Sequence, residues 1–153
     1  MSRLRKSATA GALAVALVGG FEGLRLNAYP DPATKGPPWT ICYGHTKGVK
    51  PGDRKTIEEC KRLLVEELDV YAKGIERCVT AKMPDERFVA LVSFAYNVGV
   101  PTACKSSVVR LINAGQTRAG CDFLLRYNRA AGIVFPGLTR RRQAERELCL
   151  EGL

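Results

Sequence analysis

The strongest constraint on the fold of this chain is a long amphipathic pattern that begins at residue 57. Apolar residues recur three or four positions apart and mark one face of a helix; they are Ile57, Cys60, Leu64, Leu68, Tyr71, Ile75 and Cys78. Thr56 and Glu59 have the spacing of a capping box, which begins a helix. At ~1.5 Å per residue this helix would be ~35 Å long, longer than a small lobe is wide. We therefore expect it to bridge two lobes.

The rest of the chain predicts a mainly helical α+β protein. The run Trp39–Tyr43, which mixes aromatic and β-branched residues, indicates a short strand. Beyond the long helix we expect only helices, most of them begun by a capping residue and ended by a glycine. The expected first positions are Pro84, Ser106 or Ser107, Thr117 and Thr139, and the expected terminators are Gly99, Gly115 and Gly152.

Length and charge limit the class of protein. A chain of 153 residues, 46% of them hydrophobic, can form one compact domain with its own core. Its 24 Lys and Arg residues outnumber its 15 Asp and Glu residues, which gives a net charge of +9. This charge favours nucleic acid, anionic lipid or a negatively charged cell wall as a partner. No recognition-helix signature or zinc-finger spacing accompanies it, so we expect no nucleic-acid partner.

Six cysteines are many for a chain of this size, and no C-x-x-C pair typical of zinc or thioredoxin-like sites occurs. They are Cys42, Cys60, Cys78, Cys104, Cys121 and Cys149. We interpret them as disulfide partners, which indicates an oxidising compartment, periplasmic or extracellular. The alternative is a set of buried free thiols in a cytosolic protein. A single histidine, His45, makes no metal site, so we expect no metal.

The N-terminus joins a basic segment to an apolar one. Met1–Lys6 carries three basic residues, and Ser7–Phe21 contains no charge. Cleavage as a signal peptide would leave Glu22 at a frayed terminus. A permanent transmembrane anchor needs about twenty strongly apolar residues, more than this glycine-containing segment has. A further alternative is that the segment is simply the first helix of a soluble domain.

Two acids and a hydroxyl follow this segment. Glu22 ends the apolar run, Asp31 opens a turn, and Thr40 lies on the predicted strand. Hydrolysis of a glycosidic bond needs a carboxylic acid that protonates the leaving oxygen and a carboxylate that holds an attacking water. Two acids in a loop region are also common on a solvated surface, so their spacing alone leaves both interpretations open.

The residues around these side chains read E-G-L-R-L-x-A-Y-x-D from Glu22 and W-T-I-x-Y-G-H-T from Trp39. These motifs closely resemble the active-site stretch of the phage-type lysozymes, or endolysins, and weaker similarity continues to the C-terminus. The resemblance implies a two-lobed lysozyme-like fold with a small β-hairpin lobe at Pro30–Val49, a long linking helix, a helical lobe and a cleft between the lobes. It implies a muramidase that needs no cofactor. Such an enzyme hydrolyses the β-1,4 bond between N-acetylmuramic acid and N-acetylglucosamine of peptidoglycan and lyses a bacterial host.

Carried over residue by residue, the resemblance makes Glu22 the general acid and Asp31 the carboxylate that positions or deprotonates water. Thr40 would be the hydroxyl that helps to hold this water. The gap between Asp31 and Thr40 is longer than is usual in the family, and Lys35–Pro38 looks like an insertion at the hairpin tip. The motif that follows the gap favours Thr40 over Thr34.

Other side chains are expected to support this site. The resemblance places Arg141 next to the general acid, where it would orient that carboxyl. Tyr96 and Asn97 are candidates for lining a sugar cleft, although aromatic and amide residues near helix ends also serve in packing and capping. We expect His45 to be structural, paired with an acid such as Glu67 on the long helix.

The resemblance adds another interpretation of the N-terminus, a signal-anchor-release segment, because some endolysins carry such a marginal membrane anchor. Residues 1–21 would then hold the protein in the host inner membrane before release into the periplasm, and residues 22–153 would form the catalytic domain. We expect a monomer whose partners are peptidoglycan and, transiently, this membrane.

The disulfide pairing follows from the two lobes that the resemblance implies. Cys42 and Cys60 fall in the region of the small lobe, whereas Cys121 and Cys149 lie on two helices of the larger lobe. The expected bonds are Cys42–Cys60, Cys121–Cys149 and Cys78–Cys104.

Two other functions remain open. A lytic transglycosylase would use Glu22 alone and form an anhydro product without water, and the presence of Asp31 and Thr40 argues against it. A non-enzymatic, cationic, membrane-active protein would depend on the basic and apolar N-terminus.

Overall fold

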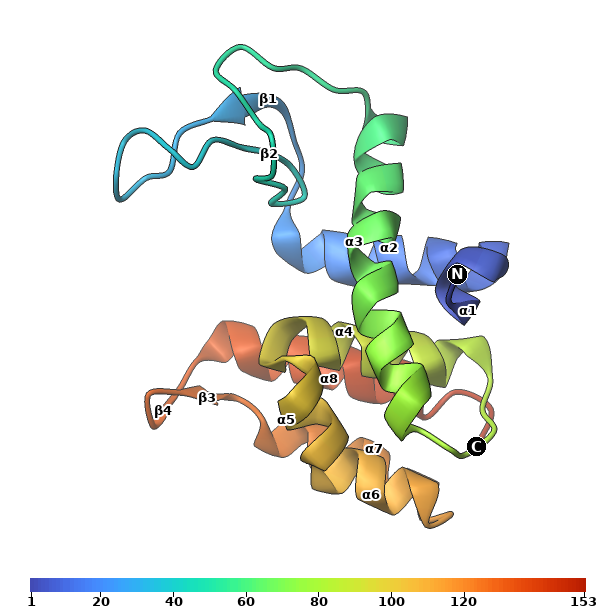
Figure 1. The fold of residues 1–153 in the computed structure, drawn as a ribbon. Coiled ribbons are helices and arrows are strands. Elements are labelled where there is room, and N and C mark those ends of the chain that lie inside the picture. The colour runs from blue at the N-terminus through green and yellow to red at the C-terminus, as the bar shows by residue number, and fades with distance from the viewer.

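The structure, a computed structural model, describes residues 1–153. The chain forms a small β lobe and a larger helical lobe, and α3 (Ile57–Cys78) runs from one to the other (Figure 1). The predicted capping box is present. The Thr56 hydroxyl accepts a hydrogen bond from the Glu59 amide at 3.1 Å, and the Glu59 carboxylate accepts one from the Thr56 amide at 3.0 Å. The predicted two-lobed, mainly helical α+β fold with a long linking helix is confirmed.

The small lobe contains one antiparallel pair of strands, β1 (Arg25–Tyr29) and β2 (Thr40–Cys42). The predicted boundary of the hairpin, Pro30–Val49, is wrong because the first strand lies before Pro30. A proline has no amide hydrogen for a strand ladder, so Pro30 ends β1 rather than beginning the hairpin. The inserted residues Lys35–Pro38 lie in the connection between the two strands.

The helical lobe is built around α4 (Asp85–Val98). Residues 87–95 of this helix are all buried, because α2, α3 and α8 contact it from different sides (Figure 1). Apolar residues such as Val89 and Leu91, which point to opposite sides, therefore occur all around α4 and not on one stripe. The other elements of the lobe are α1 (Arg3–Lys6), α2 (Ala8–Glu22), α5 (Val100–Lys105), α6 (Ser107–Asn113), α7 (Thr117–Phe123), a 3-10 turn η1 (Leu124–Arg126) and α8 (Pro136–Cys149).

The uncharged N-terminal segment forms α2. Ser7 separates it from α1 and caps it by accepting a hydrogen bond from the Ala10 amide at 3.1 Å. Ala10 and Ala14 are buried against the lobe, whereas Ala12 and Ala16 on the opposite face are exposed. None of the helices in the structure has both the length and the apolar composition that crossing a membrane requires.

The prediction that only helices follow α3 is wrong at one place. A second pair of strands, β3 (Arg129–Ala130) and β4 (Ile133–Val134), forms a short antiparallel hairpin. Ala131 and Gly132 make its turn with φ values of 51° and 78°, the left-handed conformation that two-residue hairpin turns require. The Gly followed by Ile-Val-Phe is the sequence signal for this hairpin.

The last helix, α8, begins at Pro136 and not at Thr139 as predicted. Proline suits the first turn of a helix because the amide hydrogen that it lacks has no partner there. The Thr139 hydroxyl instead accepts a hydrogen bond from the Asn128 side-chain amide at 3.1 Å. Arg141 consequently lies beyond the first turn of α8, and the helix ends at Cys149.

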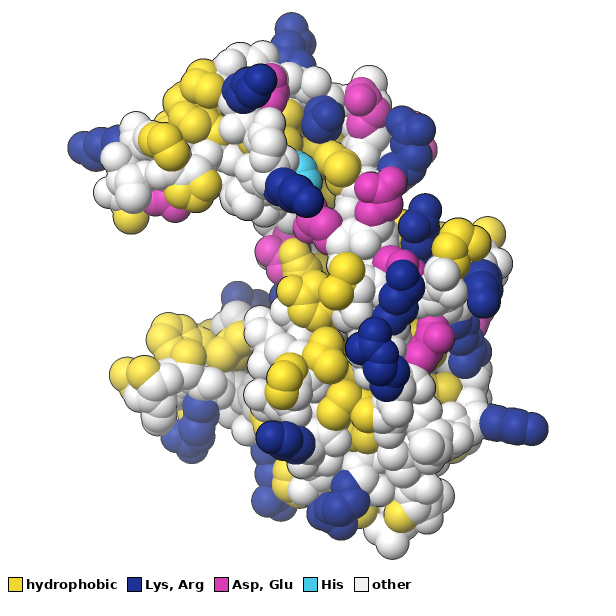
Figure 2. All heavy atoms as spheres, viewed as in Figure 1, with side chains coloured by type: hydrophobic (Ala, Val, Ile, Leu, Met, Phe, Trp, Pro, Cys, Tyr) yellow, Lys and Arg dark blue, Asp and Glu magenta, His cyan; other side chains and the backbone are white.

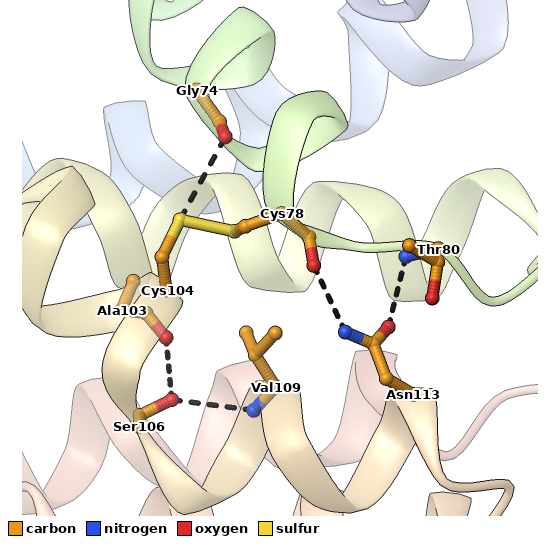
Figure 3. Close-up of a disulfide and its surroundings, with 8 residues drawn as sticks. All are labelled: Gly74, Cys78, Thr80, Ala103, Cys104, Ser106, Val109 and Asn113. Atoms are coloured by element: carbon orange, nitrogen blue, oxygen red, sulfur yellow. Dashed lines mark hydrogen bonds between the residues drawn. A yellow bond between two sulfur atoms is a disulfide. The ribbon is translucent and has the colours of Figure 1, made fainter.

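All three predicted disulfides, Cys42–Cys60, Cys78–Cys104 and Cys121–Cys149, are confirmed. The first joins β2 to α3, and the third joins α7 to the end of α8. Figure 3 shows the second bond, which ties the end of α3 to α5. Asn113 secures the same junction, since its side chain donates to the Cys78 carbonyl and accepts from the Thr80 amide, both at 2.9 Å (Figure 3).

Candidate active site

A deep cleft opens between the two lobes, and acidic side chains lie at its inner end (Figure 2). One rim belongs to the lobe of β1 and β2, and the other carries the hairpin of β3 and β4 (Figure 1). The end of α2 that leads into β1 reaches the inner end of this opening (Figure 1). The fold thus brings the last residue of α2 to the place where the lobes meet.

Glu22 is this last residue of α2. The helix stops here because Gly23 adopts φ 76°, a conformation that favours glycine, and donates its amide hydrogen to the Gly19 carbonyl. The Glu22 side chain is 31% exposed and pairs with Arg141, whose Nη1 lies 3.2 Å from its Oε1. A carboxylate that stays partly open to solvent while one oxygen is held by a guanidinium can still meet a ligand in the cleft.

Arg141 is buried, with 7% of its side chain exposed, and reaches Glu22 from α8. Its guanidinium carbon lies 5.4 Å from the centre of the Phe21 ring and 6.0 Å from that of Tyr96, distances typical of cation–π contacts. The structure therefore brings together the two residues that the sequence predicted to be neighbours, although they are 119 positions apart.

Asp31 and Thr40 lie at the two ends of the connection between β1 and β2. Asp31 Oδ1 accepts hydrogen bonds from the amides of Ala33 at 2.8 Å and Thr34 at 3.0 Å, which leaves Oδ2 without a protein donor. Thr40 begins β2 and pairs in register with Tyr29. The local turn fixes the Asp31 carboxylate and keeps one of its oxygens free for a water or a ligand.

Tyr96 and Asn97 lie in the last turn of α4, in the helical lobe. The Tyr96 ring stacks on Tyr71 with 5.1 Å between ring centres, and burial, followed by the negative charge of Glu22, raises the pKa of Tyr96 to about 12. Tyr96 is thus held beside Glu22 as a neutral phenol. Asn97 is exposed and lines a pocket of about 290 Å³ together with Tyr127 and residues of the β3–β4 hairpin.

His45 and Glu67 meet between the small lobe and α3. The His45 Nδ1 atom contacts the Glu67 carboxylate, and the His45 main chain exchanges two hydrogen bonds with Ile41, at 2.8 and 2.9 Å. These contacts tie the end of β2 to the linking helix. Gly44, the residue before His45, lies next to Glu22, since a side chain at Gly44 would begin 3.8 Å from Glu22 Oε2.

Two residues that contact Arg141 behind Glu22 were not predicted from the sequence. They are Ser93 on α4 and Glu145 on α8. Glu145 Oε2 lies 3.4 Å from Arg141 Nε and accepts a hydrogen bond from the Ser93 hydroxyl at 2.6 Å. Burial raises the pKa of Glu145, and the neighbouring Arg142 opposes this effect. The only sequence signal was an acid four positions after Arg141 on a predicted helix.

Comparison with known proteins agrees with this arrangement. Residues 19–145 match the family model described as phage lysozyme. The chain belongs to the phage lysozyme family. It is 38% identical to the SAR-endolysin of bacteriophage PS119 over 93% of this chain and 89% of that protein. A family match over most of the chain, with endolysin relatives of similar length, makes it a peptidoglycan-hydrolysing endolysin of the lysozyme type.

Two crystal structures of the P1 phage endolysin Lyz represent two conformations, and both are 30% identical in sequence to this chain. The active form superposes on 92% of this chain and 84% of that chain with a TM-score of 0.76. The secreted inactive form superposes on 69% of this chain and 76% of that chain with a TM-score of 0.53. The fold described here therefore resembles the active form over more of its length.

Proposed function

We propose that Glu22, Asp31 and Thr40 are the catalytic residues of this endolysin. They would hydrolyse the β-1,4 bond between N-acetylmuramic acid and N-acetylglucosamine. Glu22 protonates the leaving oxygen, while Asp31 and Thr40 hold and activate the attacking water. The observation that carries the proposal is the state of Glu22, a partly exposed carboxyl at the end of α2 that Arg141 holds at the inner end of the cleft.

Asp31 has the features that a water-binding carboxylate needs. One oxygen is held by two main-chain amides and the other has no protein donor. We expect an inverting mechanism, in which water attacks from the face opposite the leaving group and the two carboxyls stand roughly 6.5–9.5 Å apart. The first product formed would then have the α configuration, and NMR of the fresh product would detect it. A β product, or a covalent sugar on Asp31, would contradict this mechanism.

The test of Glu22 is the variant Glu22→Gln, which keeps the shape of the side chain but cannot donate the proton. We expect release of reducing ends from purified peptidoglycan to fall at least ~100-fold, because general acid catalysis contributes that much or more. Glu66→Gln, at an exposed position of α3, is the matched control and should keep wild-type activity. An active Glu22→Gln enzyme would overturn the assignment, and anhydro products without reducing ends would indicate a transglycosylase.

We also propose that residues 1–21 act as a releasable anchor in the host inner membrane before the enzyme works in the periplasm. The segment is uncharged from Ser7 to Phe21 and follows a basic start. Glu22 terminates the same helix, so a protein still anchored through this segment would hold Glu22 at the membrane edge, away from Arg141. Activity would begin only after release.

In the folded enzyme the N-terminus contacts acidic residues. These contacts support a release step in which the segment leaves the membrane and docks on the enzyme. Ser2 donates to the buried Asp69, and Arg3 Nε donates to Asp85 at 2.8 Å. The Arg3 main-chain amide donates to Glu76 at 2.7 Å. These acids would attract the basic N-terminus once it has left the membrane. Fractionation of host cells before lysis tests the proposal: the wild-type protein should be found with the inner membrane, and a wholly cytoplasmic protein would contradict it.

A further inference from the structure

The Arg141 guanidinium lies between two carboxylates. Nη1 faces Glu22 at 3.2 Å, whereas Nε faces Glu145 at 3.4 Å. Nη2 approaches the carbonyl and the hydroxyl of Ser93, both at 3.4 Å. Because the guanidinium is planar and rigid, contacts at Nε and Nη2 determine the direction in which Nη1 points. The side of Arg141 that faces the core therefore controls the side that faces Glu22.

Glu145 is the centre of these core contacts. Its side chain is fully buried, and its Oε2 atom accepts hydrogen bonds from the Ser93 hydroxyl at 2.6 Å and from Arg142 Nη2 at 2.9 Å. Its Oε1 atom lies 2.6 Å from Arg142 Nε. One buried carboxylate thus serves two consecutive arginines, and without it Arg142 would be buried without a carboxylate while the positive charge of Arg141 lies nearby.

Neutralising Arg142 explains why an acid is buried here, but it does not explain the link to Arg141. Glu145 contacts Arg141 directly at Nε, and Ser93 adds a second link, because its hydroxyl donates to Glu145 and also lies beside Arg141 Nη2. The contacts run from Arg142 to Glu145, from Glu145 directly and through Ser93 to Arg141, and from Arg141 to Glu22.

We propose that Glu145 is a positioning residue for the general acid: it fixes the Arg141 guanidinium in the orientation in which Nη1 meets Glu22. The proposal rests on the assigned role of Glu22 and extends it to a residue that does not touch the substrate. Without Glu145, Arg141 turns about its side-chain bonds and Glu22 loses its fixed direction in the cleft. A small displacement of a reacting group lowers the rate of the chemical step more than it weakens substrate binding.

The test must separate positioning from folding, because removal of Glu145 alone leaves the buried charge of Arg142 without a carboxylate. The double variant Arg142→Met/Glu145→Leu replaces the buried ion pair with apolar side chains of similar size, an exchange that proteins often tolerate. We expect a folded enzyme whose kcat is lowered about tenfold while its KM stays within about twofold of wild type. Glu147→Gln, at an exposed position of the same helix, is the matched control and should leave both constants unchanged.

A second comparison establishes whether the effect passes through Arg141. The loss of kcat caused by Arg142→Met/Glu145→Leu is measured again in an Arg141→Gln background, with each variant normalised to its folded fraction by circular dichroism. If Glu145 acts through Arg141, the tenfold loss should shrink to less than about twofold in that background. If the double variant does not fold, Ser93→Ala replaces it in the same comparison, because the Ser93 hydroxyl links Glu145 to Arg141.

Two results would overturn the proposal: a folded double variant with unchanged kcat, or a loss of kcat that is equally large with and without Arg141. Neither result depends on the identity of the general acid. That assignment is tested separately by Glu22→Gln, so failure of one hypothesis can be distinguished from failure of the other.

Discussion

At the scale of single residues, Arg141 and Tyr96 surround Glu22 from the helical lobe. Arg141 supplies a positive charge that is buried between Phe21 and Tyr96 and held by Glu145. Tyr96 supplies a phenol whose ionisation would put a second negative charge beside Glu22. The protein avoids this, since burial and the charge of Glu22 raise the pKa of Tyr96 to about 12.

This shift predicts a loss of stability at high pH. In the unfolded chain a tyrosine has a pKa of about 10, so between about pH 10 and 12 the unfolded state releases a proton that the folded state retains. Stability should therefore fall as pH rises through this range and be unaffected below it. Thermal unfolding should show a weaker dependence on alkaline pH for Tyr96→Phe than for wild type. Equal dependence in the two proteins would show that Tyr96 keeps an ordinary pKa.

At the scale of elements, α1 and α2 are held to the helical lobe by charges and not only by apolar contact. Asp85, at the start of α4, accepts hydrogen bonds from the Ser7 hydroxyl and the Arg3 side chain, both at 2.8 Å. The hydrogen bond from Ser7, more than the nearby charge of Arg3, lowers the pKa of Asp85. The start of α2 is thereby fixed to the start of α4.

Acid should therefore loosen the N-terminus. A carboxyl whose pKa is lower in the folded state contributes stability above its unfolded value of about 4, and this contribution disappears as pH falls through the folded pKa. Asp85→Asn should cost about 1 kcal/mol at neutral pH, and its deficit relative to wild type should shrink as pH falls below about 4. Thermal unfolding between about pH 6 and 3 measures this difference. A deficit that stays constant over this range would rule out the ionised Asp85 as its source.

The exposed face of α2 allows the anchor to be strengthened without disturbing the folded enzyme. Ala12, Ala16 and Gly20 are exposed, and a side chain at Gly20 would meet nothing within 4 Å, whereas one at Gly19 would lie 3.0 Å from the Tyr43 ring. Leucine at the three exposed positions should favour membrane insertion by ~0.5 kcal/mol each.

We expect the triple leucine variant to stay longer in the membrane fraction and to delay lysis, while the purified folded enzyme keeps wild-type activity. Serine at the same three positions is the matched control and should hasten release. Membrane fractionation combined with lysis timing provides the measurement. Release of the leucine variant at the wild-type time would contradict an anchor that is governed by the hydrophobicity of α2.

At the scale of the whole molecule, two of the three disulfides stabilise different lobes. Cys42–Cys60 ties β2 to α3, and Cys121–Cys149 closes the far end of the helical lobe. They close loops of 18 and 28 residues, so each should contribute ~3 kcal/mol by restricting the unfolded chain.

Replacement of each pair with serine should lower the free energy of unfolding by about this amount, as measured by chemical denaturation. The local consequences should differ between the pairs. Loss of Cys42–Cys60 should reduce amide protection mainly in residues 25–55, and loss of Cys121–Cys149 mainly in α7 and α8. Equal loss of protection in both lobes would show that the lobes unfold as one unit.

Much of the fold could be predicted from local patterns in the sequence. The spacing of apolar residues from Ile57 to Cys78 predicted α3, and Thr56 predicted its first turn, because helix period and capping depend on residues close in sequence. The hairpin of β3 and β4 was not predicted, since two-residue strands have too few positions to display a period of two. The start of α8 was misplaced because both Pro136 and Thr139 are good residues for beginning a helix.

The sequence by itself determined the motif around Glu22, Asp31 and Thr40, because these residues lie on one short stretch whose residue types carry the chemistry. Only the tertiary structure decided what holds Arg141 beside Glu22. Ser93 and Glu145 come from two helices far along the chain, and a buried acid has the same sequence signature as an exposed one. Burial and the distance between charges arise when α2, α4 and α8 assemble, so no local pattern could have shown that Glu145 holds Arg141.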